Sequence, residues 1–94
     1  MELQLIDVRT ADGSRVFLRL PLSIAGSRLV ARVARLPEAA VINNLVESGW
    51  FDFLYGEHRF LVRTDGRHWL LSVDDPRMSD VLLFRVARAI AGDE

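Results

Sequence analysis

The sequence predicts an α+β domain in which helices pack on one face of an antiparallel sheet of four or five strands. Two observations lead to this fold class. Apolar stretches flank an Asp-Gly pair at 12–13 and again at 65–66, a pattern typical of β-hairpins. Three other stretches combine helix start and stop signals with apolar residues at helical spacing. In chain order the elements read β-β-α-α-(β)-β-β-α, which is typical of the α+β class.

The 94 residues are expected to form a single domain, 1–94, because shorter pieces could not bury separate cores. Half of the residues are hydrophobic and 27% are charged, as in an ordinary globular protein. The absence of cysteine excludes disulfides, thiolate nucleophiles and sulfur-ligated metals. The N-terminal residues lack the basic and apolar regions of a secretory signal, and no apolar run approaches the length of a membrane span, so a cytoplasmic protein is expected.

The first hairpin joins residues 3–9 to residues 15–20 through a three-residue loop that ends at Gly13. This loop would pair Val8 with Val16. The expected apolar face then consists of Ile6, Val8, Val16, Leu18 and Leu20.

The second hairpin spans residues 57–74, and a two-residue turn at Asp65-Gly66 would pair Val62 with Trp69. One face would carry Phe60, Val62, Trp69, Leu71 and Val73. The other would carry Arg59, Leu61, Arg63, His68, Leu70 and Ser72, a mixed pattern typical of a sheet face that is solvated or that meets a partner. Residues 50–55 form either a further strand or a turn packed on the core.

Three segments are predicted to be helices. The first covers residues 27–36 and the second runs from Pro37 to the residue before Gly49. The third starts at Ser79, which is suited to an N-cap, and stops at Gly92. Its buried stripe is expected to consist of Leu83, Val86, Ala87 and Ile90.

The two halves of the sequence resemble each other. Val-Arg-Thr precedes both Asp-Gly pairs, and Arg-Val-Ala-Arg at 32–35 recurs at 85–88. The interval between the glycine and this second motif is the same in both halves. A duplicated ββα unit would explain the repeat, with the acidic second helix inserted between the copies. Chance recurrence of common hairpin and helix patterns is the alternative.

The charge distribution does not indicate a dominant nucleic-acid-binding field. The net charge is −1, although residues 37–57 contain four acidic residues and no basic one. All twelve basic residues are arginine, which a GC-rich coding sequence would also produce. A candidate basic patch consists of Arg28, Arg32 and Arg35 on the first helix and Arg59 and Arg63 on the second hairpin. A solvated outer face is the alternative interpretation of this patch.

No catalytic constellation is evident, so the chain is not expected to be an enzyme or to hold a cofactor or metal. The predicted register places His58 and His68 on opposite faces of the sheet, which excludes a shared proton transfer. The adjacent Asp74 and Asp75 precede Pro76 and are typical of a turn that leads into a helix. The serines lack a nucleophile-elbow motif, and no phosphate-binding loop is present.

Apolar residues in excess of one core suggest a protein partner. Val81 and Phe84 lie off the stripe of the third helix, and Trp50, Phe53 and Tyr55 supply further bulky surface. Both sets either belong to the core or form a binding face, and the third helix could form a homodimer. The leading hypothesis is a non-enzymatic interaction module of the adaptor, inhibitor, immunity or chaperone type. The alternatives are a weak nucleic-acid-binding protein that uses the basic patch and a small hydrolase or nuclease without a recognisable motif.

Overall fold

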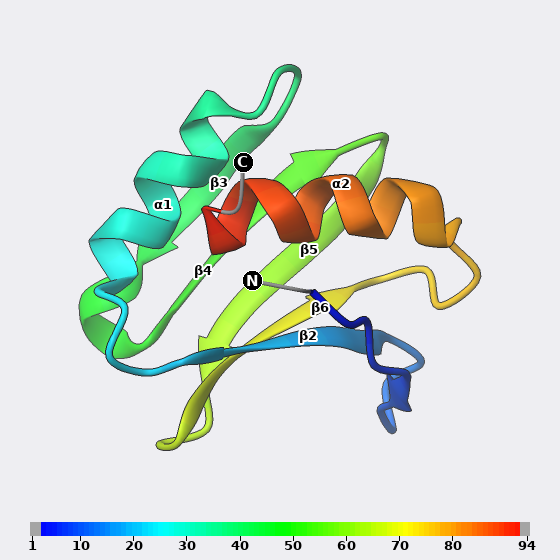
Figure 1. The fold of residues 1–94 in the computed structure, drawn as a ribbon, viewed down its shortest axis with the longest axis horizontal. Helices are drawn as coiled ribbons and strands as arrows, with labels where there is room; N and C mark the ends of the chain where they lie inside the picture. Colours follow the sequence, from blue (N-terminus) through cyan, green and yellow to red (C-terminus); the bar gives the residue numbers. More distant parts are fainter. Residues whose placement is uncertain (1–2, 93–94) are drawn as a thin grey trace.

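A computed structural model describes residues 3–92 of the chain. These residues form six strands, two α-helices and one short 3₁₀ turn (Figure 1). In chain order the elements are β1 (Val8–Arg9), β2 (Arg15–Pro21), α1 (Gly26–Arg35), β3 (Ala40–Leu45), η1 (Val46–Ser48), β4 (Trp50–Tyr55), β5 (His58–Thr64), β6 (His68–Val73) and α2 (Asp80–Ala91).

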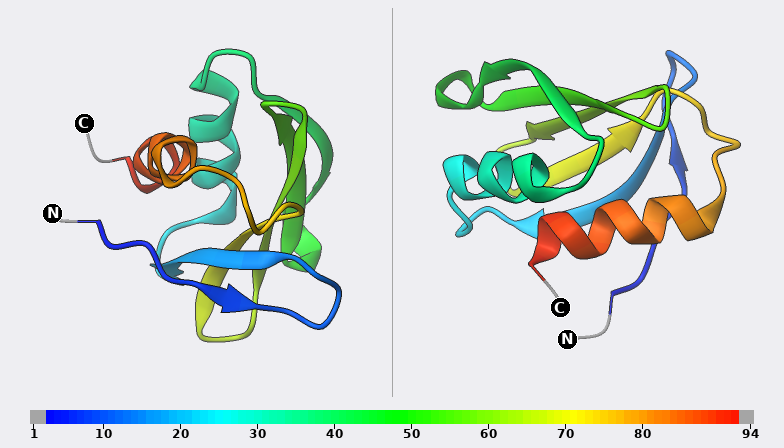
Figure 2. Two further views of the ribbon diagram at one scale, coloured as in Figure 1. Left: turned by 90° about the vertical axis from the view of Figure 1, so that its right-hand side faces the viewer. Right: turned by 90° about the horizontal axis from the view of Figure 1, so that it is seen from above.

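The strands form one antiparallel sheet in the order β1-β2-β6-β5-β4-β3. The chain leaves β2, passes through α1 and enters the sheet again at the opposite edge as β3. Each following strand then pairs with the one before it until β6 meets β2. Both helices lie on the same side of the sheet, and the other side carries no helix of residues 3–92 (Figure 2). The predicted α+β class and one-sided helix packing are confirmed, but the sheet has six strands where four or five were expected.

The predicted second helix is wrong, because residues 37–48 form β3 and η1. Leu36 ends α1 in an extended conformation, and Glu38 takes a left-handed one with φ of 71°, so the helix does not continue. Residues 41–44 are two β-branched residues followed by two asparagines, which are weak helix formers, and β3 pairs with β4. The run at 50–55 is therefore a strand, and the element order is β-β-α-β-β-β-β-α.

The second hairpin has the predicted faces but a different register. Trp69 pairs with Thr64, two residues further along than the expected partner Val62. The Asp65 side chain accepts hydrogen bonds from the backbone N–H groups of Arg67 and His68 and so moves the turn by one residue. A slip of two residues between the paired strands leaves every side chain on its predicted face, because side chains alternate with a period of two.

A β-bulge changes the faces of the first hairpin. Val8 pairs with Val16 as predicted, but the register shifts between Val16 and Leu18. Leu18 lies opposite Leu71 on the helix side, whereas Val16 lies opposite Ser72 on the other side. The expectation that Val16 and Leu18 share one face is therefore wrong, since the extra residue in a bulge reverses the alternation.

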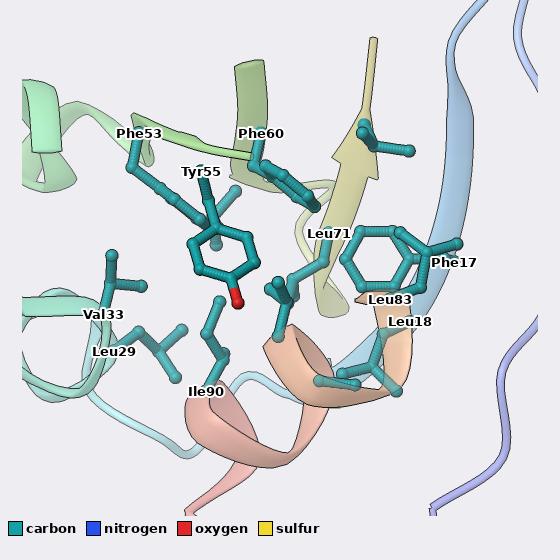
Figure 3. Packing of buried hydrophobic residues seen from close by; sticks show 14 of the residues in the cluster. Phe17, Leu18, Leu29, Val33, Phe53, Tyr55, Phe60, Leu71, Leu83 and Ile90 are labelled. Atoms are coloured by element: carbon teal, nitrogen blue, oxygen red, sulfur yellow. The ribbon is translucent and has the colours of Figure 1, made fainter. Parts of the chain in front are cut away.

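The core fills the space between the sheet and the two helices (Figure 3). Aromatic rings from three strands meet there: Phe53 stacks on Phe60 with ring centroids 5.0 Å apart, and Phe17 meets the edge of the same ring at 5.9 Å. The predicted stripe of α2 is buried, and this helix begins and ends where the sequence indicates. The Ser79 side chain accepts a hydrogen bond from the N–H of Val81, and Gly92 is the C-cap.

The two ββα units are compatible with the proposed repeat. β2 and β6 begin at Arg15 and His68, an interval equal to that between the two turn glycines, and each leads to a helix on the same side of the sheet. The inserted segment between them consists of β3, η1 and β4 and not of a helix. The duplication stays a hypothesis.

Candidate protein-binding surface

The helix-free face of the sheet is the candidate functional surface. Residues opposite each other in an antiparallel pair share a face, so the register defines rows that cross the sheet. One row crosses five strands from β3 to β2 and consists of Leu45, Trp50, Arg63, Leu70 and Arg19. We call these five residues the cross-strand row. The row combines three apolar side chains, one of them an indole, with two guanidinium groups. No helix of residues 3–92 lies over this face of the sheet (Figure 2).

Large apolar side chains on this face are partly or largely exposed. Leu45 and Leu54 are each 44% exposed, and Trp50, Leu61 and Leu70 are half-buried. A hollow of about 400 Å³ lies beside Trp50 and Leu61 and is bounded by Arg59 and Arg63. Trp and Arg are enriched at protein interfaces, and an apolar centre with polar neighbours is typical of such a surface.

Asp52 is the only acidic residue in the six strands that the structure describes. It lies on the helix-free face, opposite Leu61, yet it is only 1% exposed. Arg59 lies next to it, with Nε 2.8 Å and an Nη atom 2.7 Å from Oδ2, and the backbone N–H and side chain of Asn43 donate to Oδ1 at 2.9 and 3.0 Å. Burial of the Asp52 carboxyl opposes ionisation, but the hydrogen bonds from Arg59 and Asn43 outweigh it and hold the pKa of Asp52 below its usual range.

The Asp52–Arg59 pair leaves two arginines on this face without a counter-charge. Arg19 and Arg63 are exposed and make no ion pair or side-chain hydrogen bond with any residue in 3–92. By contrast, Arg15 on the helix side binds the carbonyl of Ile6 and the carboxylate of Asp80. The helix-free face is therefore locally cationic around Leu70, which Arg19 and Arg63 flank. Asp12 and Asp74 lie at a separate hollow of about 100 Å³ beside Arg59 and Leu61.

The residues predicted to bind a partner separate into three environments. Val81 and Phe84 lie on the outward side of α2, 69% and 37% exposed, along a groove of about 590 Å³. Trp50 lies in the cross-strand row. Phe53 and Tyr55 are core residues, 0% and 7% exposed, so their assignment to a binding face is wrong (Figure 3). Residues 50–55 form a strand in which alternate side chains point to opposite faces, and these two point toward the helices.

The predicted basic patch is not one surface. Arg28, Arg32 and Arg35 are carried by α1 on the helix side, whereas Arg59 and Arg63 are on the opposite face of the sheet. Arg32 also has a structural contact, because its guanidinium donates to the backbone carbonyl of Ile90 at the end of α2 at 2.9 Å. A single ligand cannot contact both groups of arginines without enclosing the domain.

The histidines lie on opposite faces of the sheet, because His58 pairs with Tyr55 and shares the helix side with it, whereas His68 alternates with the helix-side residue Trp69. His58 Nδ1 is 3.1 Å from the carboxylate of Asp74, which also accepts from the backbone N–H of Arg59. Within residues 3–92 no three His, Asp or Glu side chains come together in a way that could hold a metal ion. None of the helices described there is long and apolar enough to cross a membrane.

The alternation of the second hairpin indicated part of this surface, namely Arg59, Leu61, Arg63 and Leu70. Sequence reasoning missed Arg19, Leu45 and Leu54. Arg19 joins the row only because β2 pairs with β6, and Leu45 only because the segment predicted to be a helix is a strand. Comparisons with known proteins add nothing to this assignment: no family model, curated protein or solved structure gives a significant match.

Proposed function

We propose that this chain is a non-enzymatic protein-interaction module that binds its partner on the helix-free face of the sheet. The observation that carries the proposal is the cross-strand row, in which Trp50 and two leucines lie beside two exposed arginines on the face of the sheet that no described helix covers. An adaptor, an inhibitor, an immunity protein or a chaperone would each use such a surface. Fold alone does not distinguish these roles, so the argument rests on the site.

The energetic argument concerns the exposed leucines. Covering Leu45 and Leu54 removes apolar surface from water, which favours association by about 25 cal/mol for each Å² covered. The neighbouring arginine stems add further apolar area while their charged ends stay at the rim. Trp50 and Leu61 border the hollow on this face and offer a place for one partner side chain to insert.

Affinity capture from the native source with matched variants tests the proposal. Leu45→Ser/Leu54→Ser removes apolar surface from the helix-free face, and Val81→Ser makes the same kind of change on α2. Both variants should stay folded by circular dichroism, because all three side chains are substantially exposed. We expect wild type and Val81→Ser to retain the same partner and the double variant to lose it. Retention by the double variant would refute the assignment of this face.

Nucleic-acid binding is the second candidate function, because an aromatic ring flanked by arginines on a sheet also suits a single strand. Phosphate-driven binding must weaken steeply as salt rises, whereas an apolar interface should change little. A gel shift at two salt concentrations separates the two candidates.

A further inference from the structure

The two unpaired arginines of the cross-strand row restrict the chemistry of the partner, provided that the proposed binding face is right. Arg63 on β5 and Arg19 on β2 lie on either side of Leu70 on β6. Neighbouring strands are about 4.8 Å apart, so the backbones of these two arginines are separated by about 10 Å. Two cationic side chains therefore flank one apolar position at a spacing that a single bound segment can span.

A partner that covers the row must supply counter-charges. Burying an unpaired guanidinium at an interface is costly, whereas a carboxylate can pair with it through two parallel hydrogen bonds. The described strands of this face have no carboxylate to offer, because Asp52 is already held by Arg59 and Asn43. Asp12, which lines a hollow beside Arg59 and Leu61, accepts hydrogen bonds from the backbone N–H and the hydroxyl of Ser14. Asp65, at the turn beyond β5, is held by backbone N–H groups.

Charge and composition favour a protein segment over a nucleic acid. The chain as a whole carries a net charge of −1, so its overall field does not attract a polyanion. Only two free guanidinium groups lie in the row, and the positions around them are Leu and Trp. A nucleic-acid site would require more cations along the path of the backbone.

We infer that the partner presents an acidic, amphipathic protein segment, with at least two carboxylates that pair with Arg19 and Arg63 and an apolar side chain between them. The carboxylates supply specificity and orientation, and the apolar contacts with Trp50 and Leu70 supply most of the affinity. A segment with the same apolar residues but basic side chains is repelled.

Selection from a random peptide display library tests this inference and does not require the partner to be identified first. Peptides enriched on the wild type are sequenced, synthesised and titrated against three variants: Arg19→Gln/Arg63→Gln, Leu45→Ser/Leu54→Ser, and Arg35→Gln on α1 as the control. We expect an excess of Asp and Glu around apolar residues in the enriched peptides. Their affinity should fall by about tenfold in the double glutamine variant, the loss expected for two interfacial ion pairs, and stay unchanged in the control.

The other outcomes of the selection distinguish failure of the acidic-partner inference from failure of the proposed binding face. Enriched peptides without acidic excess that bind less well to the double serine variant would overturn the acidic partner and leave the proposed face standing. No enrichment, or enrichment of peptides insensitive to both double variants, would overturn the proposed function as well. Tighter binding of single-stranded oligo-dT than of any selected peptide, lost in the glutamine variant, would show that the ligand is a nucleic acid.

Discussion

Arg59 on β5 binds the carboxylate of Asp52 on the neighbouring strand β4, with an Nη atom 2.7 Å from Oδ2. The acid is 1% exposed although it lies on the face of the sheet that no described helix covers. Asn43, at the bulged part of β3, completes its hydrogen bonds. The contacts of Asp52 with Arg59 and Asn43 therefore join three strands. They also neutralise the one carboxylate in the described strands, which would otherwise repel an acidic partner.

The Asp52 pair makes stability depend on pH in the acid range. The folded pKa of Asp52 lies below its ordinary value, so the ionised carboxylate stabilises the fold at pH values above the ordinary pKa. This contribution to stability disappears as the pH falls through the folded pKa. We expect Asp52→Asn to be less stable than wild type at neutral pH, with a difference that narrows below about pH 4. Urea denaturation at a series of pH values measures both proteins. A difference independent of pH would contradict the ionic role.

Trp69 should be an anchor of the core. It is 6% exposed and its indole N–H donates to the carbonyl of Ile24 at 2.9 Å. We expect Trp69→Ala to lower the free energy of unfolding by about 3–5 kcal/mol, from the cavity and the lost hydrogen bond. Trp50→Ala, on the helix-free face, is the control and should cost less than about 1 kcal/mol. Equal losses in urea denaturation would contradict the assignment of the two faces.

Gly92 is required for two separable reasons. Its φ of 73° is left-handed, and a Cβ atom there would lie 2.7 Å from the Arg32 guanidinium carbon. Gly13 has φ of 89°, and a Cβ atom there would meet no heavy atom within 4 Å, so Gly13→Ala tests backbone strain alone. We expect Gly13→Ala to lower the free energy of unfolding by about 1 kcal/mol and Gly92→Ala to lower it by more. Thermal unfolding measures both losses. Equal losses would show that Arg32 moves aside freely.

The outward side of α2 is expected to form a homodimer through Val81 and Phe84. Symmetric pairing is a common way for a small protein to cover such a patch. Because Phe84 is 37% exposed, Phe84→Glu should fold and be monomeric, whereas wild type should be a dimer at high micromolar concentration. Size-exclusion chromatography with light scattering measures the oligomeric state of each protein, and circular dichroism shows whether the variant is folded. A monomeric wild type together with an unfolded variant would place Phe84 inside the core of one chain.

The elements with strong local signals could be predicted from the sequence. Ser79 and Gly92 bound α2, and the alternation in β5 and β6 assigns their faces correctly even though the register slips by two. In both cases a short stretch of chain carries the information. The same holds for Trp69, whose burial follows from the face it shares with Leu71.

The errors arise where distant contacts decide the local structure. Pro37 and the apolar residues after it suit a helix start, but the pairing of β3 with β4 makes that segment a strand. Val16, Phe17 and Leu18 are consecutive apolar residues, so alternation does not decide which of them share a face, and the bulge is defined only once β2 pairs with β6. The candidate surface depends on the same two pairings, which is why Arg19 and Leu45 could not be assigned to it from the sequence.

Site-specific photocrosslinking in cells of the native source tests the central claim most directly. A photoreactive amino acid at position 54 lies on the helix-free face, and one at position 31 lies on the exposed side of α1. We predict that position 54 crosslinks to one specific protein, that position 31 does not, and that Arg19→Gln/Arg63→Gln weakens the crosslink. A partner crosslinked from position 31 and not from position 54 would contradict the assignment of the helix-free face as the binding surface.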